Sequence, residues 1–172
     1  MSGAFGKALR SQGKPAEDKI AAIFYDAGWS VRGGGNTPAW DLIVERDGLP
    51  FWLEIKNEDG QIHTGNLCIE RYQGKHGSEF SGLYHSDAHA WVHTLGEFAV
   101  VYRAQYMRNW LHAEGYQDDS LVMRGDNGNL SWLAPIARIK DLPWCERCLL
   151  GRLPHSRVFW EINGLAAGCW KE

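Results

Sequence analysis

The chain of 172 residues contains 18 Lys and Arg against 21 Asp and Glu, and its 44% hydrophobic residues include 9 Trp. The charge balance excludes a polybasic protein that coats nucleic acid, and the aromatic content excludes a disordered chain. Because the sequence has no membrane-length apolar run, no secretory segment and too few cysteines for a disulfide scaffold, we expect a cytoplasmic protein with no membrane partner.

The N-terminal part of the chain predicts a helix that precedes the strands. Residues 1–14 are rich in Gly, Ser and Lys and predict a flexible arm. Pro15 suits a helix start and Gly28 a helix end, so we expect a helix over residues 16–27. Glu17 heads the inward stripe of this helix, which continues through Ile20 and Phe24. A short strand over 29–32 and a Gly-rich loop over 33–36 follow.

Apolar runs and turn residues predict most of the remaining elements. Strands are expected over 40–46, 49–56, 67–71, 89–95 and 98–103, and a helix over 104–114 that ends at Gly115. Residues 121–124 and 130–133 bracket a second hairpin, and the chain from 143 onward reads as irregular and aromatic. We therefore expect one α/β (α+β) domain over 15–142, a leading helix and then a mixed β-sheet flanked by helices, with 143–172 packed on or extending it.

Asp47-Gly48 between the strands 40–46 and 49–56 predicts a tight hairpin turn. If Arg46 faces Leu49 across this turn, the register places Asp41 directly opposite Glu54. Lys56 then shares the face of Glu54, and Ile55 points to the apolar face.

Two facing carboxylates repel each other, so a cation is expected between them. Carboxylate oxygens, waters and a substrate phosphate are the ligands that Mg²⁺ prefers. A neighbouring Lys56 can then act on the attacking water or on the scissile phosphate, and Glu17 can add a further carboxylate. The pattern predicts metal-assisted hydrolysis of a phosphodiester. The alternative interpretation is a solvated strand face with a cross-strand lysine.

Two short segments of the chain resemble the motif of the PD-(D/E)XK nuclease superfamily. They are Asn36-Thr37-Pro38-Ala39-Trp40-Asp41 and, twelve residues later, Glu54-Ile55-Lys56. The segment 17–20 is similar to its leading acidic helix, and 64–70 with Asp87 to Trp91 resembles a phage and prophage subgroup that includes proteins like Holliday junction resolvases. The resemblance covers about residues 15–102 and departs from the motif in one respect, because two residues separate Pro38 from Asp41.

The resemblance implies a restriction-endonuclease-like core and a catalytic set of Asp41, Glu54, Lys56 and Glu17. Asp41 and Glu54 would hold Mg²⁺, or Mn²⁺ in its place, with the Ile55 backbone carbonyl and Glu17 as further ligands. Lys56 would act on the water or the phosphate. The implied activity is a Mg²⁺-dependent deoxyribonuclease, an endonuclease, in a bacterial or phage-infected cell.

Two alternatives are a structure-specific Holliday junction resolvase acting as a homodimer, and a non-catalytic DNA-binding protein that keeps the nuclease fold. Glu70 and Asp87 are secondary site candidates. The residues expected to contact DNA are Arg32, Asn36, Arg71 and Lys75, for which a scattered solvated face is the alternative.

The C-terminal part contains Cys145-x-x-Cys148 followed by His155 and Cys169, which could form a zinc site. The alternative is that these are small hydrophobic cysteines in an aromatic segment. In the strand 89–95, His89, Trp91 and His93 share one face, where they either pack or face DNA.

Overall fold

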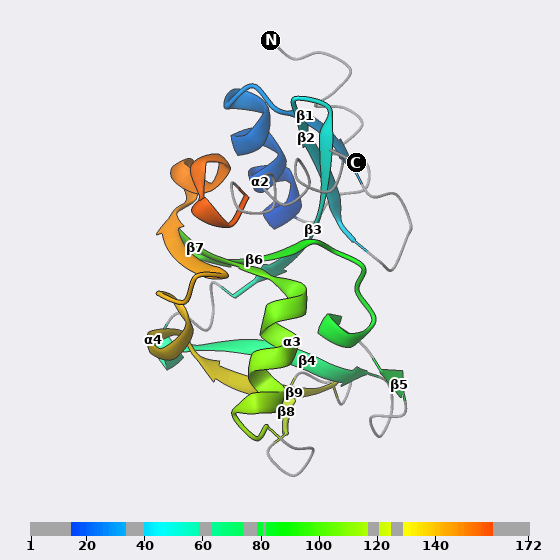
Figure 1. The fold of residues 1–172 in the computed structure, drawn as a ribbon, viewed down its shortest axis with the longest axis vertical. Helices are drawn as coiled ribbons and strands as arrows, with labels where there is room; N and C mark the ends of the chain where they lie inside the picture. The colour runs from blue at the N-terminus through cyan, green and yellow to red at the C-terminus, as the bar shows by residue number, and fades with distance from the viewer. Residues whose placement is uncertain are drawn as a thin grey trace, which may run out of the picture.

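The computed structural model describes residues 15–33, 40–58, 63–73, 79–80, 82–116, 121–124 and 129–159 (Figure 1). The arm over 1–14 and the predicted site residues Asn36, Lys75 and Cys169 lie outside the described residues.

A six-stranded sheet forms the centre of the molecule. Its strands, in spatial order, are β1 (Ser30–Gly33), β2 (Leu42–Arg46), β3 (Leu49–Asn57), β6 (Ala90–Leu95), β7 (Phe98–Arg103) and β10 (Cys145–Leu149). β3 and β6 are parallel, and the other neighbouring pairs are antiparallel. The predicted mixed sheet is therefore confirmed. The irregular structure expected after residue 143 is wrong at β10, which pairs with β7 as an edge strand.

The helix α2 (Pro15–Asp26) and the short helix η4 (Leu150–His155) cover one face of this sheet. Ile20, Ala21 and Phe24 of α2 are fully buried, as their helical spacing predicts. They pack against the apolar face of the β2–β3 hairpin. The sheet residues of this first core cluster are Val31, Leu42, Val44, Phe51, Leu53, Ile55, Ala90, Val92, Ala99 and Val101.

A helix and a second sheet cover the opposite face. The helix is α3 (Ala104–Ala113), and the sheet has the order β5 (Glu79–Phe80), β4 (Asn66–Gln73), β9 (Asn129–Pro135) and β8 (Val122–Arg124) (Figure 1). The short helices η2 (Gly82–Tyr84) and α4 (Ile136–Ile139) flank it. The second core cluster lies between the sheets and includes Leu67, Ile69, Trp91, Tyr102, Met107, Leu111 and Trp132. The single sheet expected from sequence is thus two sheets.

The β2–β3 hairpin has the predicted register. Asp47 and Gly48 both have positive φ values, 54° and 78°. Positive φ at both central residues is required by the two-residue hairpin turn whose twist matches that of the strands. Arg46 pairs with Leu49, and the ladder continues to Leu42 opposite Leu53. The paired residues end at Leu42 and Leu53, so the predicted pair of Asp41 and Glu54 lies one position beyond the ladder.

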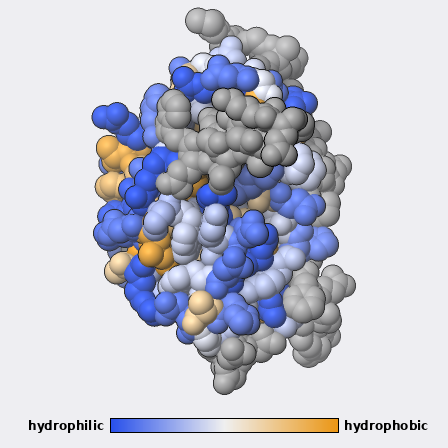
Figure 2. All heavy atoms as spheres, in the orientation of Figure 1, coloured by the Kyte–Doolittle hydropathy of each residue, from blue (hydrophilic) through white to orange (hydrophobic). Residues whose placement is uncertain are grey.

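Polar residues cover most of the molecular face in Figure 2, where the apolar residues gather in small groups. The large hydrophobic residues that are exposed within the described ranges are Tyr25, Tyr106 and Leu149. No helix in these ranges is both long and apolar enough to cross a membrane.

Candidate active site

Asp41 is fixed to β3 by two hydrogen bonds at the point where β2 begins. Its backbone N–H donates to the Leu53 carbonyl at 2.8 Å, and its Oδ2 accepts the Ile55 backbone N–H at 2.8 Å. The carboxylate thus takes the place of a main-chain acceptor. Since the N–H and C=O of one strand residue point toward the same neighbouring strand, the Ile55 carbonyl also faces the side of Asp41.

Glu54 and Lys56 form an ion pair on the same strand face. Lys56 Nζ donates to Glu54 Oε1 at 2.6 Å, and the exposed fractions of the two side chains are 33% and 12%. Lys56 Nζ also lies 5.2 Å from the centre of the buried Trp91 ring. The lysine is therefore held over an aromatic surface, and its ammonium group is directed at the carboxylate.

The charges around Lys56 keep it protonated. Burial acts to lower the pKa of Lys56, but the charge and hydrogen bond of Glu54, together with the charges of Asp41 and Glu70, raise the pKa overall. A protonated lysine stabilises negative charge on a phosphate and cannot remove a proton from water.

Glu70 approaches this group from the second sheet. It lies on β4, and its negative charge contributes to the raised pKa of Lys56. The backbone of Gly82 in η2 packs closely on it: a Cβ atom at residue 82 would lie 2.5 Å from the Glu70 carbonyl oxygen. With φ at +56°, this position favours glycine for both space and conformation. Asp41, Glu54 and Glu70 are therefore all close enough to Lys56 for their charges to raise its pKa.

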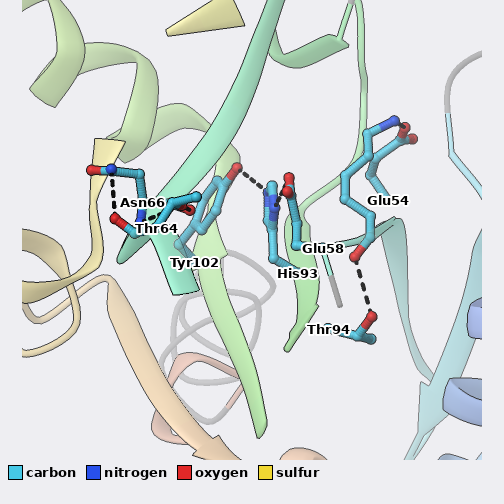
Figure 3. A network of polar contacts seen from close by, with 8 residues as sticks. Glu54, Glu58, Thr64, Asn66, His93, Thr94 and Tyr102 are labelled. Carbon is cyan, nitrogen blue, oxygen red and sulfur yellow. Dashed lines mark hydrogen bonds and ion pairs between the residues drawn. The ribbon is translucent and has the colours of Figure 1, made fainter. Parts of the chain in front are cut away.

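Sequence reasoning missed a buried chain of hydrogen-bonded polar residues beside Lys56. His93 Nδ1 lies 3.2 Å from Glu58 Oε1, and His93 Nε2 lies 2.9 Å from the Tyr102 hydroxyl (Figure 3). His93 and Tyr102 are fully buried, and Glu58 is nearly so. A signal was present, because Glu54, Lys56 and Glu58 alternate along one strand face and His93 pairs with Lys56 in the neighbouring strand.

The protonation of this chain follows from its burial. Burial lowers the pKa of His93 more than the nearby Glu58 raises it, so the imidazole is neutral at neutral pH. Burial raises the pKa of Tyr102 well above its ordinary value, so the hydroxyl keeps its proton. The Tyr102 O–H therefore donates to His93 Nε2, and His93 Nδ1–H donates to Glu58.

Two predicted acidic residues lie apart from this group. Glu17 is on α2, which covers the opposite face of the six-stranded sheet, and Asp87 is exposed in the segment before β6. Neither is among the described groups whose charges shift the Lys56 pKa. The sequence correctly predicted which residues of α2 face inward. These residues pack against the first core cluster, on the face of the six-stranded sheet opposite to Lys56.

The basic residues expected to contact DNA have different surroundings. Arg32 is 64% exposed and lies 3.8 Å from Glu45 on the neighbouring strand. The guanidinium of Arg71 lies 4.0 Å from the centre of the Tyr84 ring and 5.0 Å from that of Trp132. Arg32 thus presents its charge to solvent, whereas Arg71 is packed among aromatic rings.

Cys145 and Cys148 lie on opposite faces of β10. Cys145 belongs to the second core cluster, and Cys148 packs against the first, as a separation of three residues on a strand requires. Burial raises the pKa of each thiol to about 12, which disfavours the thiolate that zinc binds. Within the described residues, no three His, Cys, Asp or Glu side chains form a metal-binding group, and this applies to Asp41, Glu54 and Glu70 as much as to the cysteines. The hydrophobic interpretation of these two cysteines therefore fits the structure better.

Comparison of the chain with models of protein families and with curated proteins finds no match.

Proposed function

We propose that the chain is a Mg²⁺-dependent deoxyribonuclease that hydrolyses DNA phosphodiester bonds with water. One observation carries this proposal: the carboxylates of Asp41, held by the Ile55 N–H at 2.8 Å, and of Glu54, hydrogen-bonded to Lys56 at 2.6 Å, both raise the pKa of Lys56. Two carboxylates beside a partly exposed lysine ammonium are groups that metal-assisted phosphodiester hydrolysis uses.

The oxygen donors at this position fit a hard divalent cation. Asp41 and Glu54 supply carboxylate oxygens, and the Ile55 carbonyl faces the same side. Mg²⁺ usually takes one or two carboxylates and completes its shell with waters and substrate phosphate. Bound there, it would act as a Lewis acid that activates water and offsets the charge of the phosphate.

The residues of the chain have separate tasks in this reaction. Asp41 and Glu54 would hold the cation, with Asp41 kept in place by its hydrogen bond to β3. Lys56, held over Trp91, stabilises the negative charge that grows on the phosphate oxygens as water attacks and the bond to the leaving oxygen breaks. Its proton is also available to that leaving oxygen.

The test is cleavage of linear, circular, single-stranded and four-way-junction DNA in the presence of Mg²⁺ or Mn²⁺. We expect Glu54→Gln and Lys56→Met each to reduce the cleavage rate by about 100-fold or more. Glu45→Gln is the matched control, because Glu45 lies on the same hairpin and faces Arg32. If the two site variants cleave as fast as the wild type, the site is wrong.

A non-catalytic DNA-binding role is the second candidate. The 2.6 Å contact of Lys56 with Glu54 favours it, because an ammonium group on a carboxylate oxygen also balances charge without a metal. This role predicts DNA binding that is indifferent to divalent ions and to Lys56→Met. Calorimetric titration with Mn²⁺ separates the two functions, since only the nuclease requires binding that Asp41→Asn abolishes.

A further inference from the structure

Three aromatic rings stack across neighbouring strands next to the carboxylates. The Trp40 and Trp52 rings have centroids 4.9 Å apart, and those of Trp52 and His89 are 4.6 Å apart, with an interplanar angle of 17° in both pairs. Because β3 lies between β2 and β6, Trp40 covers one ring face of Trp52 and His89 covers the other. The stack forms a row across the sheet, and Trp52 lies two residues before Glu54 on the same face of β3.

The end of the stack at His89 is open to solvent. Trp40 packs partly against the second core cluster, whereas His89 is exposed. His89 Nδ1 accepts the Trp52 backbone N–H at 3.5 Å, which orients the ring and makes Nε2 the nitrogen that carries the proton in the neutral imidazole. Burial lowers the pKa of His89, in keeping with a neutral ring at neutral pH. The exposed end therefore offers a neutral aromatic face with one hydrogen-bond donor.

We infer that this stack binds an unpaired nucleobase of the DNA strand that is cleaved, with the base stacked on His89. This inference rests on the proposed nuclease function, because it takes the scissile phosphate to lie at Asp41 and Glu54. Trp52 and Glu54 are two residues apart on one strand face, about 6.6 Å, a distance that a single nucleotide spans between its base and its phosphate. The stack is thus continuous with the proposed phosphate site, and the substrate class is single-stranded or locally unpaired DNA.

A base paired within a duplex has both of its faces covered by its neighbours. It cannot stack on His89 unless it leaves the helix, at a cost in lost pairing and stacking. Stacking on a protein ring is tolerant of sequence, because every base has a π-face. The structure therefore favours unpaired DNA without specifying a base.

The experiment measures binding of labelled oligonucleotides by fluorescence anisotropy, with Ca²⁺ in place of Mg²⁺ and intact DNA verified on a gel. The probes are single-stranded DNA, the matched duplex, and an abasic strand with the same phosphates. We expect the single strand to bind most tightly. His89→Ala should weaken its binding by about 5- to 100-fold and leave duplex and abasic binding unchanged. His89→Tyr keeps a ring and should retain the affinity.

His85→Ala is the matched control, since His85 is an exposed histidine outside the stack. Equal binding of the abasic and normal strands, or wild-type binding by His89→Ala, would overturn the inference. Cleavage with Mg²⁺ is measured separately. Cleavage that does not depend on His89 would support the nuclease function and refute the stacking site. Binding that depends on His89, without cleavage, would support the stacking site and refute the nuclease function.

Discussion

The buried His93 makes the stability of the protein depend on pH in a defined direction. Its pKa is lowered in the folded state by burial, whereas in the unfolded chain it returns to about 6.5. As the pH falls below that value, the unfolded chain takes up a proton that the folded protein does not. The free energy of unfolding is therefore fully retained above about pH 6.5 and decreases as the pH falls toward the lower pKa of the folded state.

The magnitude follows from one proton at one buried group. The steepest contribution of His93 is about 1.4 kcal/mol per pH unit. His89 acts in the same direction with a smaller share, because it is exposed to screening by solvent. Glu58 and Lys56 act directly on His93, and Cys145, Glu58 and Glu54 are the titratable groups whose charges act on Tyr102.

The assay is urea unfolding of the wild type and of His93→Gln at several values between about pH 8 and pH 5. Glutamine has a donor and an acceptor but does not titrate, so the variant should lose about 1–3 kcal/mol at neutral pH and show a flatter pH dependence. His112→Gln, at an exposed position of α3, is the control and should keep the wild-type slope. An identical slope in wild type and His93→Gln would refute the neutral buried imidazole.

Two further predictions concern packing. Gly82→Ala should lower the free energy of unfolding by about 1–3 kcal/mol, because the added Cβ would lie against Glu70 at a positive φ. Gly151→Ala, where no atom lies within 4 Å of the added Cβ, should be nearly neutral in the same urea experiment, and equal effects of the two changes would contradict the close approach. Alkylation of Cys145 and Cys148 at about pH 8 can be followed by mass spectrometry. It should be more than about 10-fold slower in the native protein than in denaturant, because the raised thiol pKa values leave little thiolate. Similar rates in the two conditions would show that the thiols are accessible.

The β2–β3 hairpin was predictable from sequence because one local signal determines it. Asp47 and Gly48 adopt the positive φ values of a two-residue turn, and the turn then sets every pair as far as Leu42 and Leu53. The predicted pair of Asp41 and Glu54 lies one position beyond this ladder and is not among its pairs. The hydrogen bond from the Ile55 N–H to the Asp41 carboxylate was not predictable, because it depends on where β2 starts to pair.

Features that depend on contacts distant in sequence were missed. The second sheet requires β4 to pair with β9, about sixty residues further on, and no local pattern specifies such a partner. β10 was missed because Cys145 and Cys148 pack on different cores, which gives the strand no simple alternation. For Glu17, the helical stripe gave the correct inward direction but not the face of the sheet that α2 covers.

The charges around Lys56 bear on how a chain of net charge −3 could act on DNA under the proposed function. Asp41, Glu54 and Glu70 all raise the pKa of the Lys56 ammonium through their charges. Glu58 is the fourth carboxylate, and its charge is met by the hydrogen bond from His93. A DNA phosphate would be repelled by the Asp41 carboxylate unless a cation were bound there. The acidity of the chain therefore does not argue against a nucleic-acid partner; it makes the proposed cleavage conditional on a divalent ion.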